Sequence, residues 1–507
     1  MNRSVLTFAA FVTSLFAQSP AAQIGSIFSN YQHPDTPGCA VGVDLPDQPE
    51  WKAAYGMADL EHEVANTAGT VFEAGSVSKQ FTAAAVLLLV EGGRVSLGDD
   101  IRKYFPEIPV YPRVITVRNL LDHTSGLRDW GEIESIAGWP RGTREYTHTD
   151  VLDILSRQKA LNYLPGDQWS YTNSGYNLAA ILVERVSGMT LEAFCRKELF
   201  LPLRMTATHW RDDFRKVVPN RAIAYSKRGS EWGQDMPFEN VYGNAGLLTT
   251  VDDLLKWNRN MASGSFHSSI FDQMQKATSL GNGREVGYGL GLFLEKTHGL
   301  RQIAHSGATA GYRTWLGRIP SKNISIAILC NAGSADTGDL AGRIVNSLLG
   351  ADSVQHIVTP SDLKLGLYRS TRDHATIDVT RHGTAILFDG EPAAIPFRFD
   401  GHNIFTANPV YGEDVWEPVD QWKPAEPAQY VGTYASEEAE TTLQVGIEGS
   451  RLIIRQHRGG KFVLSPTFED AFFCPLGRVL FLREQGKVNG MRLSGSRVWD
   501  LRLHRTT

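Results

Sequence analysis

Residues 72–93 read FEAGSVSKQFTAAAVLLLVEGG, and this segment decides how the rest of the chain is interpreted. Ser76 and Lys79 stand three residues apart at the start of a long run of Ala, Leu and Val. Residues with this spacing share one face of a helix, so the lysine amine can lie beside the serine hydroxyl. A hydroxyl needs such a base to be a good nucleophile, and the N–H groups at a helix start suit a developing oxyanion. The pattern therefore predicts covalent catalysis by Ser76.

Two other Ser-x-x-Lys strings make the pattern weak evidence by itself. They begin at Ser156 and Ser361. Ser156 lies late in a helical pattern, where a surface residue is expected, and Ser361 follows Pro360 near an apparent domain junction. Because Ser76 follows a strand-like piece and a small-residue turn and precedes a buried type of helix, we assign the nucleophile to it.

The overall composition is that of an ordinary globular protein. The chain has 507 residues, of which 42% are hydrophobic and 21% are charged, and its net charge is -5. This length is enough for two or three domains. No long run of one sign of charge favours nucleic acid or an anionic membrane, so we expect neither as a partner.

The N-terminus resembles a secretory signal peptide at residues 1–22. Arg3 supplies a basic start, residues 5–16 form a short apolar core, and Ala17 and Ala21 are small residues suited to a cleavage site. An uncleaved N-terminal anchor is the alternative. No later apolar run approaches the roughly 20 residues that a membrane span needs. We expect a periplasmic or extracellular enzyme without stable membrane insertion.

The four cysteines are far apart and lack the spacing of a metal site; they are Cys39, Cys195, Cys330 and Cys474. Cys39 and Cys330 lie in apolar strand-like runs, where a buried free thiol is the commonest state. A disulfide can form after export, but the sequence does not pair the cysteines. We expect no metal and no cofactor.

Strand patterns at both ends of the first 350 residues enclose a mainly helical middle. They cover residues 38–43, 51–55, 312–319 and 324–329. The last two form a hairpin pattern, and a helix near Asp339–Leu349 closes the unit. We predict an α/β (α+β) domain at residues 23–352, with an antiparallel sheet built from both ends and flanked by helices.

After about residue 352 the pattern changes to short alternating strands that contain an internal repeat. Leu365–Ser370 matches Val431–Ser436, and Gly383 and Gly449 follow the two copies at the same spacing. A Pro-rich piece at 422–427 separates the copies.

This repeat predicts an all-β antiparallel barrel at residues 353–507, built from two related halves at about 363–420 and 428–507. Two small separate barrels are the less favoured alternative, because each copy is short.

Tyr171-Thr172-Asn173 is the second candidate element of the active site. It follows the turn at Pro165-Gly166 and precedes a helical pattern. A tyrosine here can act as a general base if nearby lysine charge favours its phenolate. Asn173 can hydrogen-bond a substrate amide.

His305-Ser306-Gly307-Ala308 is the third element and stands just before the strand pattern at 312–319. A strand edge here can place the Ala308 N–H opposite the Ser76 N–H, which makes an oxyanion hole. Gly307 would let a substrate backbone approach closely.

Three competing strings receive less weight because of their context: Tyr242-Gly243-Asn244, His457-Arg458-Gly459 and Lys227-Arg228-Gly229. The first lies in a Gly-rich loop and is interpreted as a turn. The second lies in the barrel repeat, and the third lies in a polar loop without a following strand.

Taken together, the three elements resemble the three motifs of the penicillin-binding-protein and class C β-lactamase superfamily. Residues 114–127 (VITVRNLLDHTSGL) and 245–250 (AGLLTT) are also similar to segments of that family. The resemblance covers about residues 30–350 and implies a β-lactamase/transpeptidase-like fold, in which His123 is structural. The C-terminal region is similar to the lipocalin-like domains attached to D-aminopeptidases, and can shape the active site or only pack against it.

The resemblance also implies an acyl-enzyme mechanism. Ser76 attacks a carbonyl carbon, while Lys79 and Tyr171 activate it and move protons. Asn173 and the segment from His305 to Ala308 bind substrate. Water or an amine then releases the acyl group.

His305 departs from the commonest pattern, because most members carry lysine at this position. A histidine at this position resembles the pattern found in D-aminopeptidases, some esterases and stand-alone peptide cyclases. It is largely neutral near pH 7, so it does not supply a permanent cation for a substrate carboxylate. This lowers our expectation of penicillin turnover or strict D-Ala-D-Ala carboxypeptidase action.

We therefore expect a secreted serine hydrolase of small peptides, amides or esters. It would be similar to D-aminopeptidases or D-Ala-D-Ala peptidases. The alternatives with related chemistry are a carboxylesterase, a β-lactamase or a peptide cyclase that uses the same site. An idle binding or scaffold relative is the alternative of another class, and the intact catalytic set argues against it.

Overall fold

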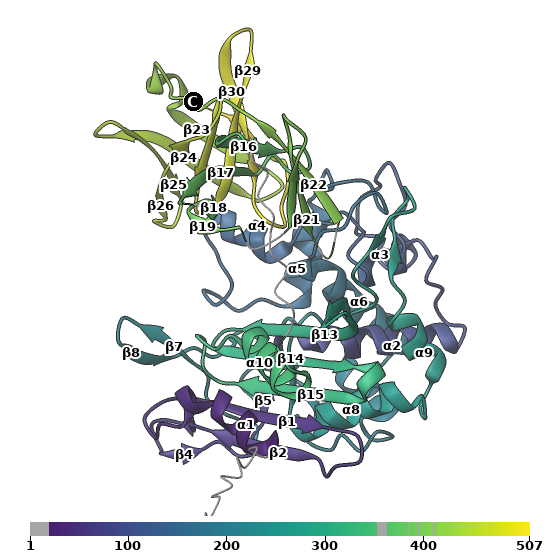
Figure 1. Cartoon of the computed structure of the whole chain (residues 1–507). Coiled ribbons are helices and arrows are strands. Elements are labelled where there is room, and N and C mark those ends of the chain that lie inside the picture. The colour runs from purple at the N-terminus through teal and green to yellow at the C-terminus, as the bar shows by residue number, and fades with distance from the viewer. Residues whose placement is uncertain are drawn as a thin grey trace, which may run out of the picture.

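The computed structural model describes residues 20–351, 362–383, 385–393, 396–408, 410 and 412–506. In Figure 1 the N-terminal part, with the large sheet and the α-helices, lies below a C-terminal part made mainly of strands. Almost all of the predicted signal peptide lies outside the described residues, and it stays a prediction. In the described part of the chain, none of the helices combines the length and the hydrophobicity of a membrane span.

The N-terminal part is built on a six-stranded antiparallel sheet with the order β12-β13-β14-β15-β1-β2. Its strands are β1 (Cys39–Asp44), β2 (Trp51–Tyr55), β12 (Phe293–Thr297), β13 (Leu300–Thr309), β14 (Tyr312–Ile319) and β15 (Ile324–Cys330). The first and last strands of the chain segment pair directly, from Cys39 opposite Cys330 to Asp44 opposite Ser325. The prediction of a sheet assembled from both ends is confirmed.

Helices cover both faces of this sheet, which explains why β15 reads ISIAILC and is buried along its whole length. On one face lie α1 (Pro20–Ile27) and α10 (Thr337–Leu349), which contact each other. On the other face lies α8 (Val251–Ser263), which contacts β1, β14 and β15.

A disulfide joins Cys39 of β1 to Cys330 of β15, with the two Cα atoms 4.0 Å apart. The two residues are direct partners across the strand pair. The sequence alone made a buried free thiol the commonest state for both, and the strand register overturns this expectation. Cys195 and Cys474 are buried free thiols.

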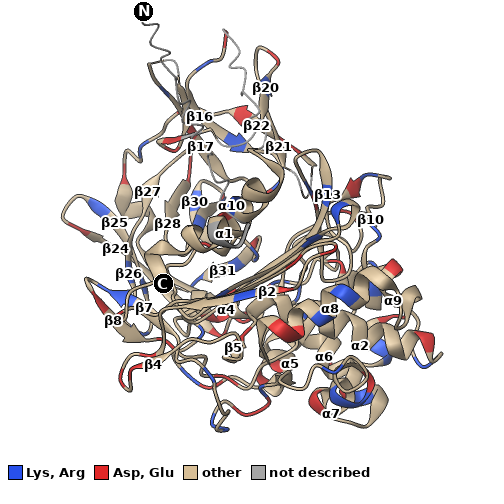
Figure 2. Cartoon of the chain, turned by 60° about the horizontal axis from the view of Figure 1, so that its bottom comes forward, with Lys and Arg blue, Asp and Glu red and all other residues tan. Residues whose placement is uncertain are grey.

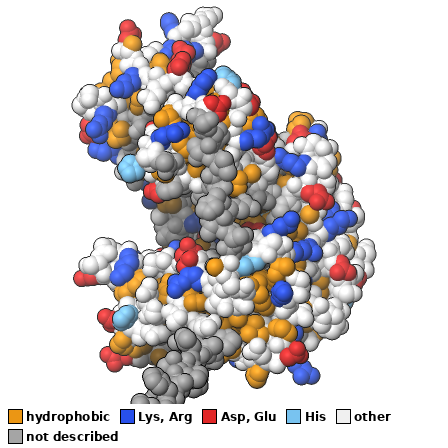
Figure 3. Space-filling model, in the orientation of Figure 1, with side chains coloured by type: hydrophobic (Ala, Val, Ile, Leu, Met, Phe, Trp, Pro, Cys, Tyr) orange, Lys and Arg blue, Asp and Glu red, His pale blue; other side chains and the backbone are white. Residues whose placement is uncertain are grey.

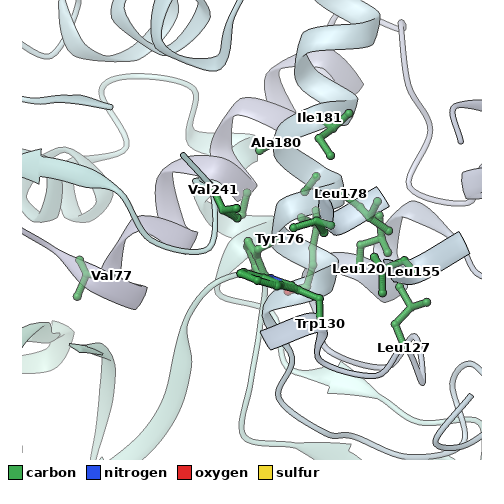
Figure 4. Close-up of a cluster of buried hydrophobic side chains, with 14 of the residues drawn as sticks. Val77, Leu120, Leu127, Trp130, Leu155, Tyr176, Leu178, Ala180, Ile181 and Val241 are labelled. Carbon is green, nitrogen blue, oxygen red and sulfur yellow. The ribbon is translucent and has the colours of Figure 1, made fainter. Parts of the chain in front are cut away.

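The helical region is centred on α2 (Lys79–Glu91) and α6 (Asn173–Ser187), which pack against each other. The other helices are α3 (Val117–Leu121), α4 (Trp130–Ala137), α5 (His148–Ser156), α7 (Leu191–Cys195) and α9 (Ser268–Met274). Buried apolar side chains, including Leu120, Trp130 and Tyr176, gather around α6 in Figure 4. At Gly175 of α6 a Cβ atom would lie 2.5 Å from the Leu120 carbonyl oxygen, so only glycine permits this contact with α3.

Short strands complete the N-terminal part. They are β3 (Met57–Asp59), β4 (Val64–Ala65), β5 (Phe72–Glu73), β6 (His209–Trp210), β7 (Tyr225–Arg228), β8 (Glu231–Gln234), β9 (Leu247–Thr249), β10 (Thr278–Ser279) and β11 (Glu285–Val286). The small sheet β5-β9-β6 matters for function, because β5 leads into the turn that carries Ser76. In Figure 2 basic and acidic residues are interspersed over the ribbon.

The C-terminal part contains two separate antiparallel sheets. The first copy of the repeat forms β16 (Gly366–Ser370), β17 (Thr376–His382), β18 (Ala385–Phe388), β19 (Glu391–Pro392), β20 (Phe397–Phe399), β21 (Ile404–Asn408) and β22 (Gly412–Pro418). The second copy forms β23 (Gly432–Ser436), β24 (Thr441–Glu448), β25 (Arg451–Gln456), β26 (Lys461–Val463), β27 (Ser465–Pro466), β28 (Ala471–Cys474), β29 (Gly477–Glu484), β30 (Lys487–Ser494) and β31 (Leu501–Arg505).

The second copy alone forms a nearly closed nine-stranded antiparallel barrel, so the predicted C-terminal barrel is confirmed. The prediction that both copies share one barrel is wrong, because the first copy pairs into its own seven-stranded sheet. The domain boundary near residue 352 falls in the undescribed segment 352–361 and stays a prediction.

The internal repeat is nevertheless structural. Gly366 pairs with Val379 in the first copy, and Gly432 pairs with Val445 at the matching place in the second. The Tyr368 hydroxyl donates to a carbonyl four residues earlier at 2.9 Å, and the Tyr434 hydroxyl does the same at 2.7 Å.

The second copy is fixed to the N-terminal part by a buried arginine. Arg128 is 1% exposed and donates to Glu438 Oε1 at 2.8 Å and to the carbonyls of Trp499 and Asp500. Gln456 also donates to carbonyls of α4. The barrel therefore lies against the segment that begins α4, close to the N-terminus of α6.

Candidate active site

Ser76 lies in a single tight helical turn, Gly75–Ser78, between β5 and α2. The turn is fixed through Ala74, whose N–H donates to the Leu247 carbonyl at 2.8 Å and whose carbonyl accepts from Thr314 Oγ1 at 2.7 Å. Gly75 has a φ of +50°, and a Cβ atom there would lie 2.6 Å from the Ala308 nitrogen. Glycine is therefore needed to bring the nucleophile turn against β13.

Lys79 is completely buried and points at Ser76, with 3.2 Å between Nζ and Oγ. Its Nζ donates to Asn173 Oδ1 at 3.0 Å and to the Asn244 carbonyl at 2.9 Å. Burial, and then the charge of Arg497, hold the Lys79 pKa well below its usual value. A neutral amine has two N–H groups and one lone pair, so the two acceptors leave the lone pair for the Ser76 hydroxyl proton.

Tyr171 completes this group, since its hydroxyl is hydrogen-bonded to Ser76 and Lys79 Nζ lies 4.8 Å from its ring centre. Burial raises the Tyr171 pKa to about 12, against the smaller lowering effects of the Ser76 hydrogen bond and of Arg497. The side chain is therefore a neutral phenol near pH 7. The condition set for a phenolate base, that nearby positive charge favours the phenolate, is not met here, because loss of solvent outweighs that charge.

His305, Ser306, Gly307 and Ala308 belong to β13, which directly precedes the predicted strand at 312–319. β12 pairs with β13 only as far as Ala304, so the following residues have one free edge. A Cβ atom on Gly307 would lie 2.2 Å from the Ala74 carbonyl oxygen and 3.0 Å from the Ser76 nitrogen. Gly307 is thus required for packing on the nucleophile turn, and this packing places the Ser76 and Ala308 backbone groups side by side.

His305 is 2% exposed and neutral, because burial and the Lys79 charge lower its pKa to about 3. Its Nδ1 lies 2.6 Å from the Ser306 carbonyl oxygen, and its Nε2 lies 3.2 Å from the Tyr288 hydroxyl. A carbonyl can only accept, so Nδ1 carries the proton and Nε2 accepts from Tyr288.

The same tyrosine links His305 to His123, whose Nε2 lies 3.2 Å from the Tyr288 hydroxyl. The Thr172 N–H donates to His123 Nδ1 at 3.3 Å, so the proton of this neutral ring lies on Nε2. A one-way chain of hydrogen bonds therefore runs from Thr172 through both histidines to the Ser306 carbonyl on the edge of β13. His123 supports the site from behind and does not line the cleft.

These side chains line a cleft with a volume of about 690 Å³. Its walls include all of the proposed catalytic and binding residues except the fully buried Lys79. The residues that line the cleft include Ser76, Arg141, Tyr171, Asn244, Arg313 and Arg497. Figure 3 shows the surface hollowed between the N-terminal and C-terminal parts.

Comparison with known proteins decides the family. A family model described as Beta-lactamase matches residues 24–349. The chain belongs to the β-lactamase family. The arrangement of Ser76, Lys79 and Tyr171, together with this membership, makes the protein a serine hydrolase.

The curated relatives of this β-lactamase family protein include a D-aminopeptidase from Brucella anthropi. It is 27% identical over 443 residues, which is 82% of this chain and 82% of the relative.

Solved structures share the fold. The octameric penicillin-binding protein homologue from Pyrococcus abyssi is 21% identical, with a TM-score of 0.57 over 88% of this chain and 99% of its own. A D-amino acid amidase from Ochrobactrum anthropi SV3, complexed with D-phenylalanine, is 20% identical, with a TM-score of 0.56 over 65% of this chain and 98% of its own.

Sequence reasoning missed two residues of this β-lactamase family site. It interpreted the string that contains Asn244 as a turn, yet the Asn244 carbonyl holds Lys79 and its Oδ1 accepts from Asn177 Nδ2 at 2.7 Å. A Tyr-x-Asn spacing in a Gly-rich loop was the available signal. It also missed Arg497, which lies in the barrel and has no motif around it.

The other competing strings lie away from the catalytic group. Ser156 ends α5, and its hydroxyl donates to the Asp153 carbonyl within the same helix. Lys227 lies in the β7–β8 hairpin, and neither it nor His457 is among the described residues that line the cleft. Ser361 lies outside the described residues.

Proposed function

We propose that this serine hydrolase cleaves peptide or amide bonds of small substrates through an acyl-enzyme on Ser76. The observation that carries the proposal is the environment of Lys79. The amine is buried, its two N–H groups are taken by Asn173 and Asn244, and its lone pair is left facing Ser76 Oγ. A neutral base at this place activates the hydroxyl without any further group.

The mechanism follows from this geometry. Ser76 Oγ attacks the carbonyl carbon and passes its proton to Lys79 Nζ. The negative oxygen that forms accepts hydrogen bonds from the Ser76 and Ala308 N–H groups. Tyr171 donates its hydroxyl proton to the leaving nitrogen and regains a proton from Lys79, so that both groups end as they began. Water then attacks the acyl-enzyme by the same steps in reverse order.

We further propose an activity similar to that of D-aminopeptidases or D-Ala-D-Ala peptidases. The names of the Brucella anthropi and Ochrobactrum anthropi proteins support an amide substrate with a D-residue. Asn173 can orient such an amide, although it also holds Lys79. A carboxylesterase, a β-lactamase or a peptide cyclase would use the same acyl-enzyme, and the substrate assay separates these functions.

The test is intact-protein mass and product release with D-Ala and D-Phe p-nitroanilides, p-nitrophenyl esters and penicillin. We expect acylation and anilide turnover that disappear in Ser76→Ala and persist in Ser156→Ala, the matched change in a competing string. Turnover of esters alone would indicate a carboxylesterase, and turnover of penicillin a β-lactamase. Absence of any adduct would favour an idle scaffold.

Export through a signal peptide at residues 1–22 is a separate proposal. The Cys39–Cys330 disulfide supports it, since disulfides persist in oxidising compartments. Mass analysis of the protein recovered from the periplasm or medium tests it. We expect a mature chain that lacks residues 1–22, and a full-length chain would instead favour an uncleaved anchor.

A further inference from the structure

The loop between β30 and β31 carries Arg497 from the barrel into the cleft. Its backbone is fixed to the start of α4. The Ser496 and Arg497 N–H groups donate to the Glu132 carboxylate at 2.8 and 2.6 Å, and the Arg497 carbonyl accepts from the Asp129 N–H at 3.2 Å. The buried Arg128 holds the barrel against the N-terminal part, so the backbone of Arg497 is fixed at the edge of the cleft.

The guanidinium group of Arg497 lies over the Tyr171 ring, with Cζ 4.9 Å from the ring centre, and the side chain is 40% exposed. Its nearest carboxylate oxygen is Asp129 Oδ2, at 3.9 Å. The Asp129 carboxylate already accepts from three backbone N–H groups, those of Gly131, Glu132 and Asn173. In the described part of the chain, the Arg497 guanidinium therefore has no acceptor at hydrogen-bond distance.

The other two arginines of the cleft have acceptors. Arg141 donates to both carboxylate oxygens of Glu239, and Arg313 donates to the carbonyls of Ala310 and Tyr312. Asp336, an acidic residue of the lining, caps α10 by accepting from the Asp339 N–H. Arg497 is thus the arginine among the described lining residues whose planar donor fork is available to a substrate.

The position of Arg497 also indicates which part of the substrate it meets. Tyr171 is the proton donor to the leaving nitrogen in the proposed mechanism, and Arg497 lies on the Tyr171 ring. A group bound to Arg497 therefore belongs to the leaving group. Guanidinium recognises a carboxylate through two parallel N–H···O bonds.

We propose that Arg497 binds a carboxylate on the leaving group of the substrate. The proposal rests on the proposed function and narrows it, because it favours a leaving amino acid with a free carboxylate over a neutral amine or anilide. Arg497 would supply, from the barrel, the positive charge that a neutral His305 does not provide. It also disfavours a free ammonium group on the leaving side, which Arg497 would repel.

The test compares two esters of N-acetyl-D-alanine, one with a 3-carboxyphenyl and one with a 3-carbamoylphenyl leaving group. The first is ionised at neutral pH and the second is a neutral analogue of similar shape. The kcat/KM values for both esters are measured in wild type, Arg497→Gln, Arg497→Lys and Arg502→Gln. Arg502 is an exposed barrel arginine, 59% exposed and paired with Asp500, and serves as the matched control.

We expect wild type to prefer the carboxylate ester, and Arg497→Gln to lower the ratio of the two kcat/KM values by about 10- to 100-fold. Arg497→Lys should give an intermediate ratio, because lysine keeps the charge without the fork. Arg502→Gln should leave the ratio unchanged. Damage to folding or to Ser76 affects both esters alike and cancels in the ratio.

An unchanged ratio in Arg497→Gln, or no preference in wild type, would overturn the proposal. Ser76-dependent hydrolysis of either ester would in that case still demonstrate the acyl-enzyme on Ser76, on which the proposed function rests. If Ser76→Ala hydrolysed both esters as fast as wild type, the proposed function would fail and the assignment of Arg497 would fail with it.

Discussion

The two walls of the cleft are built in opposite ways. The wall from the N-terminal part holds Lys79 and His305, which are buried and hydrogen-bonded and whose pKa values are lowered chiefly by loss of solvent. The wall from the barrel offers Arg497, which is partly exposed and has no acceptor at hydrogen-bond distance among the described residues. The first environment suits proton transfer, and the second suits binding of an anion that arrives from water.

The difference shows how a reaction and its selectivity can be separated in one chain. Chemistry on Ser76 needs groups whose pKa values are shifted, and only a packed interior shifts them strongly. Recognition of a charged substrate needs a cation that keeps its charge and remains accessible. A second domain can supply such a cation without disturbing the buried catalytic group.

Lys79→Met should produce the largest effect, because it removes the base from the buried wall. We expect kcat/KM on a p-nitrophenyl ester to fall by about 10³-fold or more, at the upper part of the range for general-base catalysis. Lys159→Met, the same change in a competing Ser-x-x-Lys string, should have no effect. If Lys79→Met kept a kcat/KM within tenfold of wild type, the Lys79 amine would not be the general base.

Arg128→Met tests how much the buried contact between Arg128 and the barrel contributes to the stability of the protein. The change leaves Glu438, whose side chain is 10% exposed, without its cation, and should cost about 3–5 kcal/mol of unfolding free energy. Denaturant unfolding measures this loss. The matched change Arg398→Met, in an exposed pair with Glu413 in the first copy, should cost about 1 kcal/mol or less. Equal losses in both variants would show that the buried contact of Arg128 stabilises the protein no more than an exposed ion pair does.

The pH dependence separates the two ionisable groups of the buried wall. In the proposed mechanism Lys79 acts as a neutral amine, so kcat/KM should fall as the pH drops through its lowered pKa, by about tenfold per pH unit below it. His305, with a pKa of about 3, is neutral on both sides of that limb. A pH profile of wild type and His305→Asn should therefore show the acid limb at the same pH. If the fall of kcat/KM at low pH disappeared in His305→Asn, the ionisation that causes this fall would belong to His305.

Tyr434→Phe and Tyr368→Phe should give the smallest effects. Each removes one hydroxyl that donates to a carbonyl four residues earlier, and should cost about 1 kcal/mol. Thermal unfolding of both variants measures the cost. Similar values would show that the hydroxyl hydrogen bond contributes equally in the two copies, and a large difference would show that its contribution depends on the surroundings of each copy.

Much of this arrangement was accessible from local sequence. Apolar alternation and turn residues predicted the strands at 312–319 and 324–329, and three short motifs predicted the residues that meet at the cleft. These signals are local, since backbone geometry and side-chain spacing act over a few residues. The role of Tyr171 was only half predicted, because its pKa depends on how much solvent the whole fold removes.

The sequence by itself indicated the nucleophile turn, several strand and helix segments, the repeat and the set of candidate catalytic side chains, because each motif or element depends on residues close together in the chain. The tertiary structure decided the Cys39–Cys330 pairing, the separate sheets of the two copies, the role of the Asn244 carbonyl and the entry of Arg497 into the cleft. The disulfide, the contact of Asn244 with Lys79 and the entry of Arg497 join segments far apart in the chain, and the separate sheets depend on which strands pair. Their contacts depend on register, burial and packing, which no local pattern encodes.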